Sequence, residues 1–177
     1  VASTAGSRFS VIDAGMGDDT FTGGTGSDVL DLSGLSGNYA VSFTGAGAGS
    51  INYSNYGTDT FTGIDEIITA GSGVSITNAD GVTITGNASS DELNFTDFSS
   101  AVTISFANSG TGTVTGGANV TFTGIEWTRG SAHDDTFNSS AGTNKVTFTH
   151  LSEGVDFDLF NGNISSTVSG NDSFTGD

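Results

Sequence analysis

Two adjacent nine-residue blocks carry the residues best suited to chemistry in this chain. They span 14–22 and 23–31 and share glycine at places 2 and 4, aspartate at place 6 and a large apolar residue at place 8. The glycines permit a tight turn with positive φ, which residues with a side chain resist. The aspartate supplies a carboxylate beside the carbonyl groups of that turn, and such oxygen ligands suit a hard cation such as calcium. The apolar residue begins a short strand whose side chain points into a core.

This pattern resembles the G-G-x-G-x-D-x-U-x nonapeptide of the RTX, or hemolysin-type, calcium-binding repeats. The resemblance implies a coil made of two nonapeptides, with calcium between turns that lie on the same side of successive coils. Carried onto this sequence, it implies carboxylate ligands at Asp19 and Asp28 and turn carbonyls near Gly15, Gly17, Gly24 and Gly26. It also implies export by a type I system and folding triggered by extracellular calcium.

The sequence departs from a full run of such repeats. The position 18 residues after Asp19 is Gly37, and the position 18 residues before Asp28 is Ser10, so neither aspartate has an aspartate opposite it. The sites are therefore half-built, weak or completed by parts of the protein outside this sequence. The other interpretation of both aspartates is that they cap turns through Asx hydrogen bonds.

Incomplete versions of the motif recur later in the chain. Residues 86–94 and 130–138 keep the apolar place and the aspartate, at Asp91 and Asp135, but lack the glycines that shape a ligand cage. Both aspartates are candidate calcium ligands, with turn capping as the alternative. Asp59 and Asp172 occur in shorter relatives of the motif, and we expect them to be turn residues.

The charge of the chain excludes several partners. Its 177 residues include 3 Lys plus Arg against 20 Asp plus Glu, a formal net charge of -17. Nucleic acid binding needs clustered cations, so nucleic acid is not an expected partner. No apolar run approaches the roughly 18 residues of a membrane helix, so we expect no membrane insertion. Such a charge repels itself, so a bound cation would favour the folded state.

A longer period organises the elements that would position the turns. The sequence FTGIDE at 61–66 recurs as FTGIEW at 122–127, and a third copy begins as FTGD at 174–177. These echoes define three units of one repeat domain, approximately 1–67, 68–129 and 130–177, which we interpret as a segment of a longer protein. Short strands between Gly, Asn and Ser turns are the only consistent pattern. The sequence predicts an all-β fold, a right-handed parallel β-roll or β-helix solenoid, with a β-sandwich as the alternative.

Three other features have both a chemical and a simpler interpretation. His133, Asp134 and Asp135 could suggest zinc binding or acid–base chemistry, but convergent partners are lacking, so we expect a solvated turn and no enzyme. Trp127 with Arg129 could stack on a sugar. Several Thr-x-Thr triplets flank an inward apolar residue, which turns both hydroxyls to one face, as in ice-binding solenoids. Their spacing is irregular, however, and Thr is simply a favoured strand residue.

Together these features predict a structural calcium-binding repeat segment of a secreted or cell-surface bacterial protein, such as an adhesin, a surface-layer protein or a matrix filament component. We expect calcium ions and neighbouring copies or repeats of the same protein as partners, with glycans as a further candidate. Two alternatives stay open. One is a carbohydrate-binding accessory module of a secreted polysaccharide-active enzyme, and the other is an ice-binding solenoid.

Overall fold

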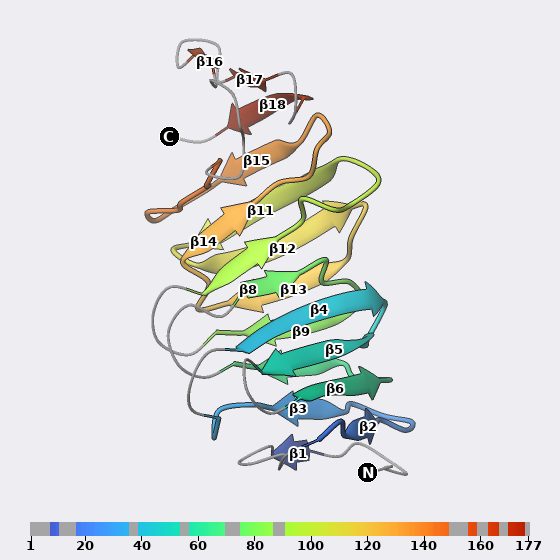
Figure 1. The fold of residues 1–177 in the computed structure, drawn as a ribbon. Coiled ribbons are helices and arrows are strands. Elements are labelled where there is room, and N and C mark those ends of the chain that lie inside the picture. The colour runs from blue at the N-terminus through green and yellow to red at the C-terminus, as the bar shows by residue number, and fades with distance from the viewer. Residues whose placement is uncertain are drawn as a thin grey trace.

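The computed structural model describes residues 8–10, 17–35, 39–53, 57–69, 75–86, 91–148, 156–158, 163–166 and 170–175. Within these ranges the chain forms strands β1 to β18 and no helix, because short apolar–polar alternations are separated by glycine-rich turns. The strands stack as rungs from the N-terminal end to the C-terminal end (Figure 1). They belong to two sheets.

The seven-stranded sheet contains, in spatial order, β14 (Trp127–Arg129), β10 (Glu92–Asn94), β8 (Ser75–Thr77), β4 (Tyr39–Gly45), β5 (Ala48–Tyr53), β6 (Gly57–Thr62) and β2 (Thr20–Thr22). The eleven-stranded sheet contains β1 (Arg8–Ser10), β3 (Val29–Asp31), β7 (Glu66–Ile68), β9 (Val82–Thr85), β13 (Val120–Thr123), β12 (Thr111–Gly116), β11 (Val102–Asn108), β15 (Thr136–Ser139), β18 (Gly170–Thr175), β17 (Asn163–Ser166) and β16 (Asp156–Asp158).

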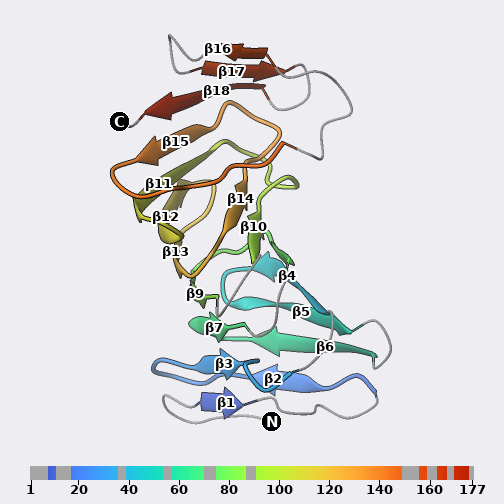
Figure 2. The same cartoon turned by 90° about the vertical axis from the view of Figure 1, so that its left-hand side faces the viewer.

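The chain repeatedly crosses from one sheet to the other, so that strands of successive coils lie side by side (Figure 2). Among the described residues, ten of the sixteen strand pairs are parallel. The prediction of an all-β solenoid is therefore confirmed.

Three antiparallel meanders interrupt the parallel stack, and the sequence did not predict them. After β3 the chain runs ahead to β4, returns through β5 to β6, and β6 pairs in parallel with the earlier strand β2. The later strand β8 then pairs with β4. The meander β11–β12–β13 returns to β9, and β16–β17–β18 returns to β15. The echoed Phe-Thr-Gly sequences mark the ends of the three returning strands, which explains the long period.

The first two meanders share one packing device. An inward glycine on the central strand lies between inward phenylalanines on both neighbours, which are Phe43, Gly49 and Phe61 in the first meander and Phe106, Gly112 and Phe122 in the second. The two rings meet edge to face across the glycine, with centroids 5.2 Å apart in the first meander and 5.8 Å apart in the second. A Cβ on either glycine would collide with the backbone of the preceding strand.

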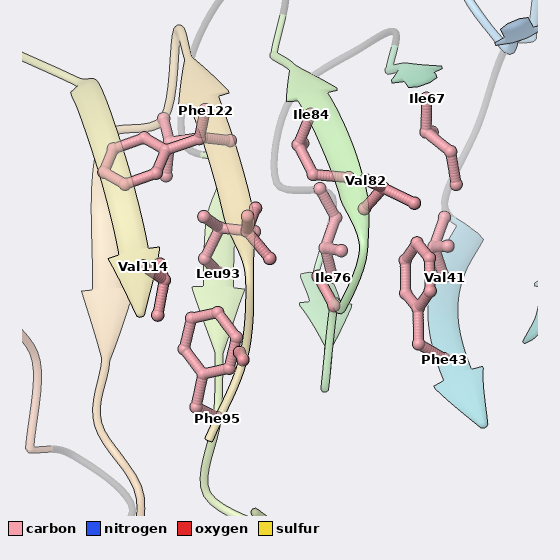
Figure 3. Packing of buried hydrophobic residues seen from close by; sticks show 14 of the residues in the cluster. Val41, Phe43, Ile67, Ile76, Val82, Ile84, Leu93, Phe95, Val114 and Phe122 are labelled. Atoms are coloured by element: carbon pink, nitrogen blue, oxygen red, sulfur yellow. The ribbon is translucent and has the colours of Figure 1, made fainter. Parts of the chain in front are cut away.

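The core lies between the two sheets and is continuous along the stack. Figure 3 shows side chains of both sheets meeting there, with Leu93 and Ile76 from one sheet and Ile84 and Phe122 from the other. All four are fully buried. Because each coil covers the apolar face of the next, no single unit completes its own core.

The first two units use opposite sheets. The pair β2/β6 belongs to the seven-stranded sheet, whereas the equivalent pair β9/β13 belongs to the eleven-stranded sheet, because the single strand β8 adds half a coil between them.

The stacking distance along the chain also differs from the 18 residues that the RTX resemblance implied. Residues facing each other in β2 and β6 are 40 residues apart, and those before β3 and β7 are 37 apart, because a meander lies between them.

Candidate functional site

Three strand pairs occupy equivalent places, one beside each meander: β2/β6, β9/β13 and β15/β18. Each is in parallel register at an inward apolar residue, with Phe21 opposite Phe61, Ile84 opposite Phe122, and Phe137 opposite Phe174. Because side chains alternate along a strand, the residue two places earlier lies on the same side as the apolar residue, and of the six residues at this place all but Asp19 are buried. That place holds Asp19 and Asp59 (the N-terminal acid pair), Val82 and Val120 (the valine pair), and Asp135 and Asp172 (the C-terminal acid pair).

Main-chain hydrogen bonds hold the N-terminal acid pair together. The Asp19 N–H donates to Asp59 Oδ1 (2.8 Å), and the Thr60 N–H donates to the Asp19 carbonyl oxygen (2.9 Å). The Thr58 N–H donates to Asp18 Oδ1 (3.0 Å). Asp59 is only 1% exposed, and its second oxygen, Oδ2, is buried without a hydrogen bond of normal geometry. Half of this carboxylate is therefore satisfied and half is not.

The C-terminal acid pair repeats this network. The Asp135 N–H donates to Asp172 Oδ1 (2.9 Å), and the Ser173 N–H donates to the Asp135 carbonyl oxygen (2.9 Å). The Asn171 N–H donates to Asp134 Oδ1 (2.8 Å). Asp172 is also 1% exposed, and its Oδ2 is also buried without a hydrogen bond. Two distant parts of the chain thus build the same site.

Burial perturbs the acid–base behaviour of the strand aspartate at the C-terminal pair. Burial of Asp172, together with the negative charges of Asp135 and Asp134, raises the pKa of its carboxyl group to about 7. The hydrogen bond from the Asp135 N–H acts in the opposite direction but is the weaker influence. A carboxyl group in this state lacks a positive partner.

The N-terminal acid pair has a tyrosine beside it. Burial raises the pKa of Asp59, and the charge of Asp19 adds to this effect, whereas the Asp19 N–H and the nearby Tyr53 hydroxyl oppose it. Burial and the charge of Asp59 also raise the pKa of Tyr53. The Tyr53 hydroxyl, like Asp59 Oδ2, is buried without a hydrogen bond of normal geometry. The Tyr53 hydroxyl and the Asp59 carboxylate therefore interact with each other, but not through a hydrogen bond of normal geometry.

Asp28 has a different environment from the strand aspartates. It is fully buried, and its Oδ2 accepts the Gly24 N–H (2.9 Å), so the carboxylate closes its own turn. Its N–H donates to Asp65 Oδ2 in the next coil (2.9 Å). These contacts make Asp28 a turn cap, which is the alternative interpretation of this residue. Calcium binding at Asp28 stays a prediction.

Asp91 is the counterpart of Asp28 in the second unit. It is fully buried, its Oδ2 accepts from the Thr69 hydroxyl (3.2 Å), and its N–H donates to Glu126 Oε2 (2.9 Å). An acidic residue of the echoed FTGI sequence thus accepts an N–H in both units. Calcium binding at Asp91 likewise stays a prediction.

Asp135 combines both roles. Its carboxylate accepts from the Ser131 N–H (2.6 Å) and hydroxyl (2.8 Å) and from the Val102 N–H (2.7 Å). Burial raises the pKa of Asp135, although these donors lower it. The side chain therefore caps its turn, while the main chain of the same residue belongs to the C-terminal acid pair.

The predicted turn glycines are placed as follows. Gly17 and Gly26 have φ of 132° and 112°, in the region that favours glycine, as the turn model predicted. Gly24 donates its N–H to Asp28 without a positive φ. Gly15 lies outside the described residues.

The expectation for Asp59 and Asp172 was wrong. Both lie within strands, β6 and β18, and both are buried rather than placed in turns. The sequence contained a signal that could have found them. Four-residue segments that end in phenylalanine with aspartate two places earlier occur at 18–21, 58–61, 134–137 and 171–174, and also at 157–160. Their alternation places the aspartate and the phenylalanine on one face of a strand.

The other candidate residues have structural partners. His133 is exposed in a turn, where its N–H donates to the Ser131 hydroxyl (3.1 Å). The Trp127 ring lies 4.7 Å from Lys145 Nζ, and Arg129 pairs with Glu92 (2.7 Å). The cation over the indole ring occupies a face that a sugar would need.

The described residues contain no group of three or more His, Cys, Asp or Glu side chains arranged to hold a metal ion. A calcium site here would therefore combine fewer acids with carbonyl, hydroxyl and water oxygens, which calcium accepts. The unpartnered oxygens of the two acid pairs fit such a cation, since a buried carboxylate needs positive charge. No helix among the described residues is long and apolar enough to span a membrane.

The outward faces of the sheets carry rows of uncharged polar side chains. Across six adjacent strands of the eleven-stranded sheet, the facing residues are Thr83, Thr121, Thr113, Ser105, Asn138 and Thr175. Across six strands of the seven-stranded sheet they are Thr20, Thr60, Ser50, Ser42, Thr77 and Asn94. We call these the two polar rows. The fold thus brings threonines of five irregularly spaced Thr-x-Thr triplets into one or the other row: Thr20, Thr60, Thr83, Thr113 and Thr121.

Comparisons with known proteins assign no relative. The chain matches no protein-family model, and neither a curated protein nor a solved structure shows significant similarity to it. The resemblance to RTX repeats therefore rests on residues 14–31.

Proposed function

We propose that this chain is a structural, calcium-stabilised solenoid segment of a secreted or cell-surface bacterial protein, such as an adhesin, a surface-layer protein or a matrix filament component. The observation that carries the proposal is the set of buried aspartates in a chain of net charge -17: Asp28, Asp31, Asp59, Asp91, Asp135 and Asp172. Burying carboxylates is costly unless positive charge or hydrogen bonds compensate.

The chain has little positive charge of its own to offer. It contains 3 Lys plus Arg in all, of which Arg129 pairs with Glu92 and Lys145 lies over Trp127. Divalent cations bound from the solvent would supply the missing positive charge. An extracellular protein meets calcium at concentrations that can fill weak sites, which supports a location outside the cell.

The test is a thermal melt followed by far-UV circular dichroism in chelator, in calcium and in magnesium. One site filled at 100 times its Kd contributes about 2.7 kcal/mol, which for a chain of this size raises Tm by roughly 5–10 °C. We expect calcium to produce such a rise, and magnesium, which demands a tighter octahedral shell, to produce a smaller one. Equal melting curves in chelator and in calcium would contradict the proposal.

The two polar rows favour one second candidate, an ice-binding surface. Neighbouring strands lie about 4.8 Å apart, so each row presents hydroxyl and amide groups at a regular repeat. Some of these groups are fixed by hydrogen bonds along the row, such as Asn138 Nδ2 to Ser105 Oγ (3.2 Å) and Thr20 to Thr60 (3.2 Å). Each row is uncharged over its six strands, and the next facing residues are Glu66 on β7 and Arg129 on β14.

Thermal hysteresis of the chain, measured with calcium present, tests this second candidate. The variant Thr121→Lys places a long cation in the middle of the row on the eleven-stranded sheet, and Asp97→Lys, on an exposed loop, is the control for charge. Ice binding predicts hysteresis that Thr121→Lys abolishes and Asp97→Lys retains. No hysteresis in the unchanged chain removes this candidate.

A further inference from the structure

We propose that the N-terminal acid pair, Asp19 and Asp59, and the C-terminal acid pair, Asp135 and Asp172, each hold one calcium ion between strands of neighbouring coils. The inference rests on the proposed function and says where the cation binds. It adds two strand residues, Asp59 and Asp172, that the turn motif does not contain, and it assigns two ions to the described part of the chain.

The first argument is the unpartnered oxygen in each pair. Asp59 and Asp172 each use Oδ1 to accept the N–H of the aspartate one coil away, at 2.8 Å and 2.9 Å. Oδ2 of Asp172 is buried without a hydrogen bond. Oδ2 of Asp59 is also buried, and the Tyr53 hydroxyl interacts with that carboxylate without a hydrogen bond of normal geometry. Buried polar atoms in folded proteins almost always have partners. The same atom lacks a hydrogen bond of normal geometry at both sites, although the sites lie on different sheets and about a hundred residues apart in the chain.

The second argument is the valine pair, which occupies the equivalent place in the second unit. Val82 faces Val120 in the same parallel register, and the two are 5% and 1% exposed. A similar flanking contact is present, since the Asn119 N–H donates to Asp80 Oδ1 (3.0 Å) as the Thr58 N–H does to Asp18, although Asp80 lies two residues before Val82 and Asp18 lies directly before Asp19. The fold can therefore fill this place with apolar side chains. Carboxylates in the first and third units are not required by the strand pairing, and a bound cation accounts for them.

Other oxygen atoms near each pair can complete a calcium shell. Calcium takes about six to eight oxygen ligands, from carboxylates, carbonyls, hydroxyls and water. The Tyr53 hydroxyl, whose contact with Asp59 lacks normal hydrogen-bond geometry, belongs to the surroundings of Asp59, and Asp18 and Asp19 are exposed beside it. At the other site, Asp134 is exposed beside Asp135.

The turn aspartates Asp28 and Asp91 differ in this respect. Their carboxylates accept hydrogen bonds from Gly24 and Thr69, and neither has an oxygen like that of Asp59 or Asp172. The acids opposite them, Asp65 and Glu126, also accept an N–H, but Asp65 is exposed and Glu126 is half-buried, and neither has a buried oxygen without a hydrogen bond. We therefore assign no ion to these two positions.

The experiment is isothermal titration of the 177-residue chain and its variants with calcium chloride, starting from chelator-treated protein. The variants Asp59→Val and Asp172→Val each introduce one valine at the place where the second unit has two. Asp97→Asn, which removes one exposed charge, is the control. We expect two ions for the unchanged chain and for Asp97→Asn, one for each single variant, and none for the double variant.

The possible results separate this inference from the proposed function. If the unchanged chain binds calcium and both valine variants keep its stoichiometry, the sites lie elsewhere and this inference is overturned while the proposed function stands. If the unchanged chain binds no calcium, both fail. Circular dichroism in chelator checks folding. If a valine variant does not fold, Asp59→Asn or Asp172→Asn, which keeps the Oδ1 acceptor, takes its place, and unchanged calcium binding by that variant overturns the assignment.

Discussion

The acid pairs and the valine pair occupy the same place in three copies of one design, yet they differ in what surrounds them. The valine pair is a continuous part of the core, whereas Asp59 and Asp172 put half-satisfied carboxylates against that core. The two acid pairs also differ from each other, because Asp19 is exposed and Asp135 is 1% exposed with three hydrogen-bond donors. Strand pairing therefore sets the geometry of this place, while the residue type sets whether it is apolar or charged.

Introducing an acid into the valine pair should have the largest effect. Val120→Asp buries a charge opposite Val82 with no partner, and we expect a loss of about 3–5 kcal/mol in the free energy of unfolding, the size of an uncompensated buried charge. Urea unfolding measures it, with Val120→Thr as the nearly isosteric uncharged control. A loss no larger than that of the control would mean that this place tolerates charge without help.

The double variant Val82→Asp/Val120→Asp tests the same difference between the valine pair and the acid pairs. It recreates an acid pair in the second unit, so calcium should restore part of the stability lost in chelator and add a third ion to the stoichiometry. Absence of any restoration would show that an acid pair alone does not make a site.

The pH dependence should be the next largest effect. The pKa of Asp172 is about 7 in the folded chain against an ordinary value of 3.8, so the folded state binds the proton more tightly. The resulting stability is complete below pH 3.8 and is lost as the pH rises through 7. Burial raises the pKa of Asp59 and Asp135 in the same direction. In chelator, Tm should therefore rise as the pH is lowered from 8 to 5.

The Asp172→Val variant is the control for this titration. It should show a higher Tm than the unchanged chain at pH 8 and a weaker dependence on pH, because the group that titrates near neutrality is gone. A Tm that falls between pH 8 and pH 5 in both proteins would contradict the assignment of the titration to Asp172.

The smallest effects should distinguish the two acid pairs from each other. Asp135→Asn replaces one accepting oxygen by an amide that faces the Ser131 N–H, and we expect a loss of about 1–3 kcal/mol in chelator. Asp19→Asn alters an exposed side chain and should change stability by no more than about 0.5 kcal/mol. Thermal or urea unfolding of both variants provides the measurement. Equal losses would mean that the difference in burial has no energetic consequence.

Much of the fold followed from local pattern. The apolar residue between two threonines, as at Phe21, Phe61 and Ile84, predicts an inward side chain in a short strand, and all three are buried in strands. The FTGI echoes predicted repeating units, and they fall at the ends of the returning strands β6 and β13. These features depend on the alternation of apolar and polar residues over a short segment, which is visible in the sequence alone.

The candidate site was less predictable because it depends on pairing across a meander. The partner of Asp19 is Asp59, 40 residues away, and nothing local to either residue says that the chain runs ahead to β4 before it returns. A search at a fixed spacing of two nonapeptides finds Gly37 instead. Gly49 is the one local hint of the meander, since a glycine between alternating apolar residues indicates close packing of neighbouring groups.

The way the meanders interlock bears on how the molecule resists being pulled apart. In a simple solenoid each coil holds only the next one, so tension on one end can peel rungs away singly. Here the spatial order is β8, β4, β5, β6 and β2. The first meander is thus paired with the later strand β8 through β4 and with the earlier strand β2 through β6. Removing one unit under load therefore breaks ladders on both sides of it at once. Under tension, such a chain should lengthen in steps of whole units, each absorbing work before the next yields.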